Sequence, residues 1–161
     1  AACWSVPAQL LNTWYMSFFQ LRGISDVLLQ WNDWALVRWL CARWSPGFSL
    51  SDKDWESRRT TFEASGVKEA MLSYYRQNVA LGVALGIEPS EAMSLRVVPV
   101  RTLIMMGLED GCMDVKFFEN TFFEEDFPDG YEIKRIEKAG HFMNLDAPDE
   151  VTHALLDWFE K

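Results

Sequence analysis

Two stretches decide how this chain is organised: VRTLIMMGLED at residues 100–110 and YEIKRIEKAGH at residues 131–141. The first is a β-branched and apolar run that breaks at Gly107, and the second alternates apolar with polar residues. Both patterns are typical of β-strands, and the segment between them has the length of a helix. Strand, helix and strand predict a parallel pair joined by a right-handed crossover. An aspartate, Asp110, ends the first stretch, and a histidine, His141, ends the second.

Asp110 and His141 each come just after the carboxyl end of a predicted strand, which is the edge where open parallel sheets form their sites. An acid that orients an imidazole and stabilises its charge is half of a catalytic triad. Gly140 lets the backbone approach closely beside the histidine. Glu109 is the rival acid, and His153, inside a predicted helix, is expected to be a surface or packing residue. We therefore predict that Asp110 and His141 form a catalytic pair, which still requires a nucleophile.

The composition limits the class of protein. The 161 residues are 49% hydrophobic and 24% charged, which fits a globular domain. The net charge of −9 argues against nucleic-acid or anionic-membrane partners. All of it comes from residues 100–161, where fifteen acidic residues face six basic ones. The three cysteines have no metal-ligand spacing and favour a reducing compartment, so we expect a cytoplasmic protein without metal or cofactor. No apolar run is long enough to span a membrane.

Residues 1–96 are predicted to be helical. Pro7 to Gly23 is one helix-length aromatic segment, and Asp26 is expected to cap a helix that runs from 27 to about 44. The predicted helices after that are a short polar one that Ser51 caps, ending near 66, and a longer one from 67 to about 85. The rest of the chain is predicted as a strand over 97–106, a helix over 113–127, a strand over 131–137 and a helix over 148–159.

The motifs GLED at 107–110, KAGH at 138–141 and DAPDEV at 146–151 resemble the C-terminal end of an α/β-hydrolase, and more narrowly its epoxide hydrolase and haloalkane dehalogenase branch. The resemblance places the family's acid on Asp110 and its catalytic histidine on His141. It implies an α/β fold with residues 1–96 as a helical lid, or cap. Residues 97–161 would be the last two parallel strands and helices of the core, and the N-terminal half of the fold would be absent.

Two lid motifs extend the resemblance. WYMSFFQ at 14–20 and YYRQN at 74–78 are similar to the epoxide hydrolase motifs that each carry a tyrosine, which implies site roles for Tyr15 and Tyr75. Two phenols that converge on an epoxide oxygen would hold the ring and stabilise the alkoxide as it opens. The plainer interpretation is that both tyrosines are amphipathic residues on helices rich in aromatics.

The chain departs from the family in one large respect. No strand-to-helix elbow with a nucleophile is present, and the nearest string, GVALG at 82–86, has alanine at its centre. The resemblance therefore implies epoxide hydrolysis through a covalent ester only when the chain is joined to an N-terminal half, and we expect the chain alone to be inactive. The alternatives are a haloalkane or haloacid dehalogenase, an esterase, or a non-catalytic binding or assembly module. The expected partners are a small apolar, epoxide-like substrate and either that N-terminal half or further copies of the chain.

Overall fold

The computed structural model describes residues 6–47, 49–78 and 97–160, and it divides the chain into two compact units. We call the first the strand-bearing unit; it draws on residues 1–12, 43–48 and 95–161. The second, the helical unit, draws on residues 13–42 and 49–94. The helical unit thus falls within the predicted lid, while two short segments of that predicted lid cluster with the strands. In the described part of the chain, no helix has both the length and the apolar character needed to cross a membrane.

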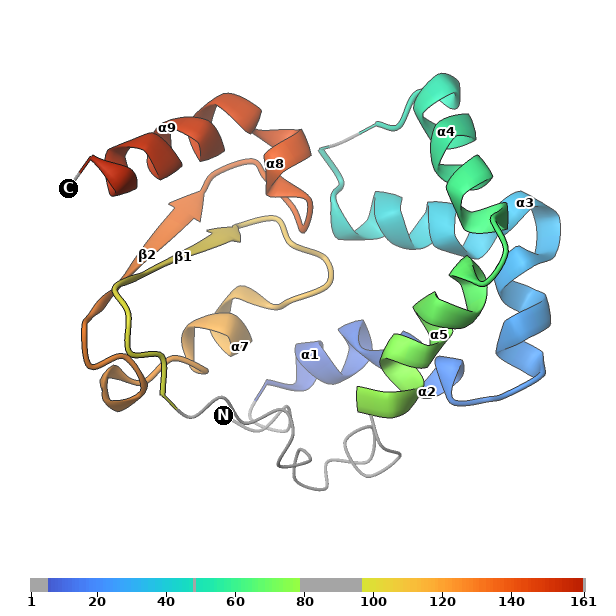
Figure 1. Cartoon of the computed structure of the whole chain (residues 1–161), viewed down its shortest axis with the longest axis horizontal. Coiled ribbons are helices and arrows are strands. Elements are labelled where there is room, and N and C mark those ends of the chain that lie inside the picture. The colour runs from blue at the N-terminus through green and yellow to red at the C-terminus, as the bar shows by residue number, and fades with distance from the viewer. Residues whose placement is uncertain (1–5, 48, 79–96, 161) are drawn as a thin grey trace. The chain divides into compact units, whose positions relative to one another are not determined.

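The strand-bearing unit contains two parallel strands, as the sequence predicted. Strand β1 (Thr102–Gly107) pairs with β2 (Tyr131–Ile136) in continuous register, from Thr102 opposite Tyr131 to Gly107 opposite Ile136. The α-helices of this unit, labelled in Figure 1, are α1 (Pro7–Asn12), α7 (Val115–Glu119), α8 (Met143–Asp146) and α9 (Pro148–Phe159). The unit also contains a short 3-10 helix, η3 (Glu124–Asp126).

The two faces of the strand pair carry different neighbours because successive strand residues point to opposite sides. On one face, Ile136 is fully buried in a cluster with Ala139 and Val151, and Met105 packs against that cluster. This is the face that α9 covers. On the other face, Arg135 forms an ion pair with Glu119 at the end of α7. Because both faces of β1 are covered, its sequence is an almost continuous apolar run.

The connection between the strands differs from the single helix predicted over 113–127. Asp114 caps α7 by accepting hydrogen bonds from two backbone N–H groups, but the helix ends after five residues. The chain then turns so that four rings gather, with neighbouring ring centroids 4.8–6.1 Å apart: Phe118, Phe122, Phe127 and Tyr131. Packing these aromatic rings together competes with continuing the helix. Helix propensity is a weak preference that such tertiary packing overrides.

The first predicted strand also begins later than expected, at Thr102 rather than Val97. The N–H of Val98 donates to the carbonyl of Asp126 rather than to a neighbouring strand. Pro99 has no N–H to give to a ladder. Residues 97–101 therefore lead into the sheet without being part of it.

The helical unit is built from α2 (Trp14–Phe19), most of α3 (Ile24–Trp44), α4 (Asp52–Glu63) and α5 (Val67–Asn78). The continuous helix predicted from Pro7 to Gly23 is wrong, because α1 ends at Asn12 and α2 begins anew after Thr13. The cap of Ser51 on α4 is confirmed, since its side chain accepts a hydrogen bond from the N–H of Asp54. The stretch predicted to continue α5 to residue 85, with the GVALG string, lies outside the described residues.

Helix α3 is kinked, which the sequence did not predict. Asn32, Asp33 and Trp34 have φ values of 52°, 58° and 59°, in the left-handed region. The kink directs Trp34 into the interior, where it is 2% exposed and packs on Phe62 with ring centroids 5.3 Å apart. Asp33 accepts a hydrogen bond from the indole N–H of Trp55 at 3.4 Å. Burial of two tryptophans offsets backbone strain of about 1–2 kcal/mol per left-handed residue.

Asp26 does not cap α3 in the predicted way, because the helix begins earlier, at Ile24. It occupies the third helical position, and its carboxylate accepts a hydrogen bond from the N–H of Gly23 at 2.8 Å, as the second half of a capping box does. The same carboxylate binds the guanidinium of Arg76 at 2.6 Å. Arg76 also donates to the carbonyl of Phe19 at 3.0 Å, and so ties α5 to the turn between α2 and α3.

The charge on Asp26 makes the stability of the helical unit depend on pH. Hydrogen bonds from Arg76 and Gly23 lower the pKa of Asp26 to about 2. A lowered folded-state pKa stabilises the fold above the unfolded pKa of about 4, and the benefit is lost as pH falls from about 4 to about 2. We expect the denaturation midpoint, followed by tryptophan fluorescence, to drop over this range in the parent protein and to drop less in Asp26→Asn. Asp52→Asn, which removes an exposed ion pair with Arg38, is the control and should behave like the parent.

Candidate active site

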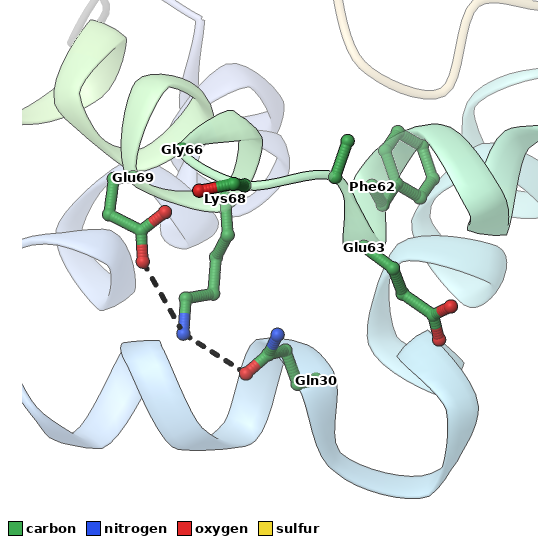
Figure 2. A pocket seen from close by; sticks show the side chains of 8 residues that line it. Gln30, Phe62, Glu63, Gly66, Lys68 and Glu69 are labelled. Carbon is green, nitrogen blue, oxygen red and sulfur yellow. Dashed lines mark hydrogen bonds and ion pairs between the residues drawn. The ribbon is translucent and has the colours of Figure 1, made fainter.

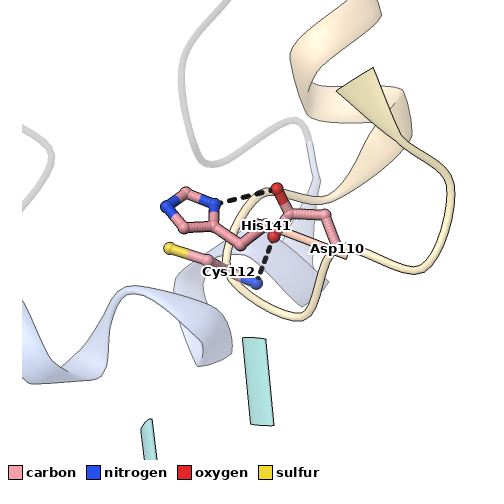
Figure 3. Close-up of side chains that lie close together, drawn as sticks. All are labelled: Asp110, Cys112 and His141. Atoms are coloured by element: carbon pink, nitrogen blue, oxygen red, sulfur yellow. Dashed lines mark hydrogen bonds and ion pairs between the residues drawn. The ribbon is translucent and has the colours of Figure 1, made fainter. Parts of the chain in front are cut away.

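The strand-bearing unit brings Asp110 and His141 into direct contact. Asp110 follows β1 and His141 follows β2, and because the strands are parallel both residues emerge at the same edge of the pair. The Oδ2 atom of Asp110 lies 3.0 Å from Nδ1 of His141 (Figure 3). The aspartate side chain is 13% exposed and the imidazole is 34% exposed. The acid is thus sheltered, while the ring remains within reach of solvent.

The other oxygen of Asp110 fixes the orientation of the carboxylate. Oδ1 accepts hydrogen bonds from the N–H groups of Cys112 at 2.6 Å and Met113 at 2.9 Å, which is an Asx turn. This leaves Oδ2 directed at the imidazole. The rival acid, Glu109, has an exposed side chain, and its N–H donates to the carbonyl of Ala139. Among the described contacts, the carboxylate that meets His141 is therefore that of Asp110.

Trp44 and Ser45 hold both site loops from a distant part of the sequence. The carbonyl of Trp44 accepts a hydrogen bond from the N–H of Gly111 at 3.1 Å and another from the N–H of His141 at 2.8 Å. The hydroxyl of Ser45, which is fully buried, accepts one from the N–H of Phe142 at 2.8 Å. A single turn thus fixes the spacing between the loop that carries the aspartate and the loop that carries the histidine.

Several residues of this site escaped the sequence analysis. Gln9 is 1% exposed and donates to the carbonyl of Cys112 at 3.1 Å, while its own side-chain oxygen accepts from the N–H of Asp114 at 2.7 Å. Gln9 and Cys112 are 103 positions apart, and no local pattern marks either Gln9 or the Trp44–Ser45 turn as part of a site. Only the apolar character of the surrounding segments gave any hint that these residues would be buried.

Asp146 helps to hold the loop that carries His141. It ends α8, a short helix that the sequence did not indicate, and its Oδ2 accepts a hydrogen bond from the N–H of Gly140 at 2.5 Å. This bond closes the loop beside His141. Asp149 does lie in the first turn of α9, where an acid favours the helix dipole. His153 is exposed on α9, in keeping with a surface residue.

In the helical unit, Tyr15 on α2 and Tyr75 on α5 lie against each other. Their ring centroids are 5.7 Å apart, and the rings are nearly perpendicular at 89°. Phe19 packs on both, with centroid distances of 5.8 Å to Tyr15 and 5.0 Å to Tyr75. Gln20, from the same motif, donates to the backbone carbonyl of Tyr75 at 3.2 Å. The two predicted tyrosines are therefore neighbours within this unit, and the sequence motifs that contain them are packed together.

A hollow at the surface of the helical unit offers little chemistry. It opens between Gln30 and the turn from α4 to α5, and Lys68 lies at its centre (Figure 2). The ammonium of Lys68 is 3.0 Å from the amide oxygen of Gln30 and 3.7 Å from the carboxylate of Glu69. These charges already compensate one another at the surface, so the hollow is not a strong candidate for a substrate site.

Comparison with known proteins relates the chain to epoxide hydrolase-like proteins. No protein-family model matches the chain. It is 24% identical to human epoxide hydrolase 4 over 90% of its length, and it covers 38% of that protein. It is 25% identical to the AB hydrolase superfamily protein YfhM of Bacillus subtilis over 96% of its length, and it covers 50% of that protein. The chain therefore spans half or less of the length of these relatives.

The solved structures agree on the fold. The chain superimposes on an epoxide hydrolase from Bacillus megaterium with a TM-score of 0.76 at 20% identity, over 99% of this chain and 55% of that one. A haloalkane dehalogenase from Bradyrhizobium elkanii gives a TM-score of 0.63 at 15% identity, over 89% of this chain and 47% of that one. The predicted fold class is confirmed: the chain carries part of the α/β-hydrolase fold. Its similarity is to the C-terminal portion of epoxide hydrolase-like α/β-hydrolases.

Proposed function

We propose that this chain supplies the water-activating histidine, its orienting acid and two phenolic donors to an enzyme that hydrolyses epoxides. The observation that carries the proposal is the 3.0 Å contact between Asp110 and His141 at the carboxyl edge of the strand pair. Tyr15 and Tyr75, whose rings pack against each other, would supply the two phenolic donors to the epoxide oxygen. Because the chain spans about half of its relatives, the activity is proposed for the protein that also carries a nucleophile.

The first step of the proposed reaction opens the epoxide. A carboxylate from the nucleophile-bearing half attacks one ring carbon, so that a carbon–oxygen ester bond forms while the ring carbon–oxygen bond breaks. The leaving oxygen becomes an alkoxide, which the hydroxyls of Tyr15 and Tyr75 stabilise by donating hydrogen bonds as the charge develops. One phenol transfers its proton to this oxygen, which leaves a hydroxy ester attached to the protein.

The second step hydrolyses that ester. His141 takes a proton from water through Nε2, because its Nδ1 is turned toward Asp110. The resulting hydroxide attacks the carbonyl carbon of the ester, and the tetrahedral intermediate collapses to the carboxylate while its hydroxyl proton passes to the departing oxygen, which releases the diol. The proton on His141 then returns through solvent to the phenolate left by ring opening, so that the neutral histidine and the phenol are both regenerated. The negative charge of Asp110 stabilises the imidazolium while the proton resides on it. The aromatic rings packed around the tyrosine pair favour a small apolar substrate.

Two related reactions compete with this proposal. A dehalogenase would use the same ester chemistry with a halide as leaving group, and the fold likeness to a haloalkane dehalogenase supports it. A serine esterase would need serine at the nucleophile elbow. The tyrosine pair favours the epoxide, because an alkoxide needs a proton donor whereas a departing halide does not. A non-catalytic binding or assembly role would leave the oriented His141–Asp110 contact without a use.

Isotope labelling tests the proposed chemistry directly. In a single turnover in ¹⁸O-labelled water, an ester pathway places the label on the protein carboxylate and leaves the diol unlabelled. Direct attack of water on the epoxide would label the diol at once. An unlabelled diol together with a labelled protein supports the proposal, whereas label in the first equivalent of diol would contradict it. The same protein is also incubated with a chlorinated alkane, and release of chloride would indicate the dehalogenase reaction instead.

The tyrosine pair gives a second test. We expect Tyr15→Phe and Tyr75→Phe each to slow ring opening by up to about 10²–10³-fold, because each change removes one transition-state donor. The ring packing remains, so the melting temperature should change little. Tyr74→Phe is the matched control, since Tyr74 is 64% exposed on the same helix. Pre-steady-state formation of the covalent adduct measures the effect; parental rates in both variants would make the two tyrosines structural.

The state of the chain by itself is a further prediction. Within the described residues, the sheet has two strands, and two strands are marginal without further cover. We therefore expect the 161-residue chain, produced alone, to be inactive toward epoxides and to self-associate or aggregate. Adding a nucleophile-bearing N-terminal half, in cis or in trans, should yield a monodisperse and active protein. Sedimentation velocity and an epoxide assay decide this, and an active monomer would refute it.

A further inference from the structure

Cys112 places a thiol at the edge of the proposed catalytic pair. One donor atom from each of Asp110, Cys112 and His141 can be chosen so that all three lie within 4.8 Å of one another. Figure 3 shows the sulfur of Cys112 beside the imidazole ring, with the carboxylate of Asp110 on the same ring. Cys112 is 5% exposed and is a reduced thiol. No metal-ligand spacing is visible in the sequence, because the whole crossover separates the histidine from the other two residues.

We propose that Asp110, Cys112 and His141 form a binding site for a single thiophilic divalent cation of the Zn²⁺ or Cd²⁺ type. The donor set decides the class of ion. A thiolate, an imidazole nitrogen and a carboxylate oxygen suit Zn²⁺ and its analogues, whereas Mg²⁺ and Ca²⁺ require oxygen ligands. Three protein ligands leave one coordination position of a tetrahedral ion for water.

The geometry requires only a small adjustment. Donors bound to one tetrahedral zinc ion at about 2.0–2.3 Å are roughly 3.5 Å apart. Atoms now within 4.8 Å of one another therefore have to approach by about 1 Å, which rotation of the cysteine and histidine side chains can supply. The imidazole is 34% exposed, so an ion can reach the site from the side of the ring.

The backbone around Cys112 keeps the thiol in place. Its N–H is bound to Oδ1 of Asp110 at 2.6 Å, and its carbonyl is bound to the side chain of Gln9 at 3.1 Å. The carboxylate and the cysteine backbone are thus parts of one rigid turn. That turn acts as the supporting shell that orients metal ligands. On binding, the Cys112 S–H bond breaks, a sulfur–metal bond forms, and the proton is released to bulk water.

An ion at this position would also inhibit the proposed hydrolysis. A metal-bound His141 cannot take a proton from water, and a metal-bound Asp110 cannot stabilise an imidazolium. This consequence rests on the proposed function, whereas binding of the ion does not. We therefore expect micromolar concentrations of the ion to inhibit the nucleophile-bearing protein, and a chelator to reverse this inhibition. Direct binding of the ion is measured separately.

The test titrates Cd²⁺ or Co²⁺ into the protein and follows the thiolate-to-metal charge-transfer absorbance together with isothermal titration calorimetry. A Cys3→Ala/Cys41→Ala variant leaves Cys112 as the remaining cysteine of these 161 residues and should bind one ion with the same spectrum as the parent. Cys112→Ala in this background should abolish the charge-transfer band, and His141→Gln should weaken binding by at least about 100-fold. Mg²⁺ should not compete.

Three results would overturn the proposal. The first is a parent protein that shows no band at one equivalent of ion, and the second is a band that persists in Cys112→Ala. The third is a Cys3→Ala/Cys41→Ala variant that stays folded by circular dichroism but binds no ion. None of these readouts involves turnover, so failure of the metal site and failure of the proposed epoxide chemistry are distinguishable. If Cys112→Ala fails to fold, the Cys3→Ala/Cys41→Ala titration alone decides the question.

Discussion

Replacing His141 with glutamine, in a protein that carries the nucleophile, is expected to stop the reaction after the first covalent step. Glutamine can still hydrogen-bond to Asp110, but it has no basic nitrogen that could take a proton from water. Turnover should fall by at least about 10³-fold, within the range of about 10²–10⁴-fold that a general base contributes. Because ring opening does not use the histidine, the ester should accumulate. Intact-protein mass spectrometry is expected to show a stable adduct of one substrate mass.

Two acidic positions provide the controls for this result. Asp110→Asn keeps the size of the side chain and should slow ester hydrolysis less than loss of the base does, because the imidazole can stay in place without its charged partner. Glu109→Gln should leave both steps unchanged, since that side chain is exposed and His141 contacts the neighbouring acid. Full turnover by His141→Gln would remove the histidine from the mechanism, and a larger effect at Glu109 would move the acid there.

The sequence was sufficient for the parts of the structure that depend on local patterns. The β-branched run before Gly107 and the alternation from Tyr131 to Ile136 predicted both strands, and parallel pairing then placed Asp110 and His141 at one edge. The Ser51 cap and the start of α9 at Pro148 also follow from local chemistry. Each of these features is decided by residues within a few positions of one another.

What the sequence could not predict depends on contacts between distant residues. The kink at Asn32 and Asp33 is stabilised by Trp55 and Phe62, and no sequence pattern near the kink predicts it. The crossover helix ends early because aromatic rings further along the chain gather. In the same way, the carbonyl of Trp44 links the two site loops from more than sixty positions away. Motifs thus revealed which residues carry chemistry, and tertiary contacts decided how these residues are held.

The second large effect is expected at Gly107, where β1 ends. A Cβ atom added there would lie 2.3 Å from the carbonyl oxygens of both Ala139 and Gly140. These oxygens belong to the backbone of the loop that carries His141, and they cannot rotate away as a side chain would. Gly107→Ala must therefore push the histidine loop away from the loop that carries Asp110. Overpacking of this kind costs about 1–3 kcal/mol and occasionally more, and we expect the upper end of that range.

The separation of the two loops should also reduce catalysis beyond the loss of stability. The N–H of Glu109 donates to the carbonyl of Ala139 at 2.9 Å, and this bond aligns the acid with the histidine. Gly47→Ala is the matched control, because its Cβ would meet the Lys138 carbonyl oxygen at an ordinary 3.4 Å. Its unfolding free energy should stay within about 0.5 kcal/mol of the parent. Chemical denaturation and the rate of ester hydrolysis test both variants; parental values in Gly107→Ala would show that the loops can separate without harm to the site.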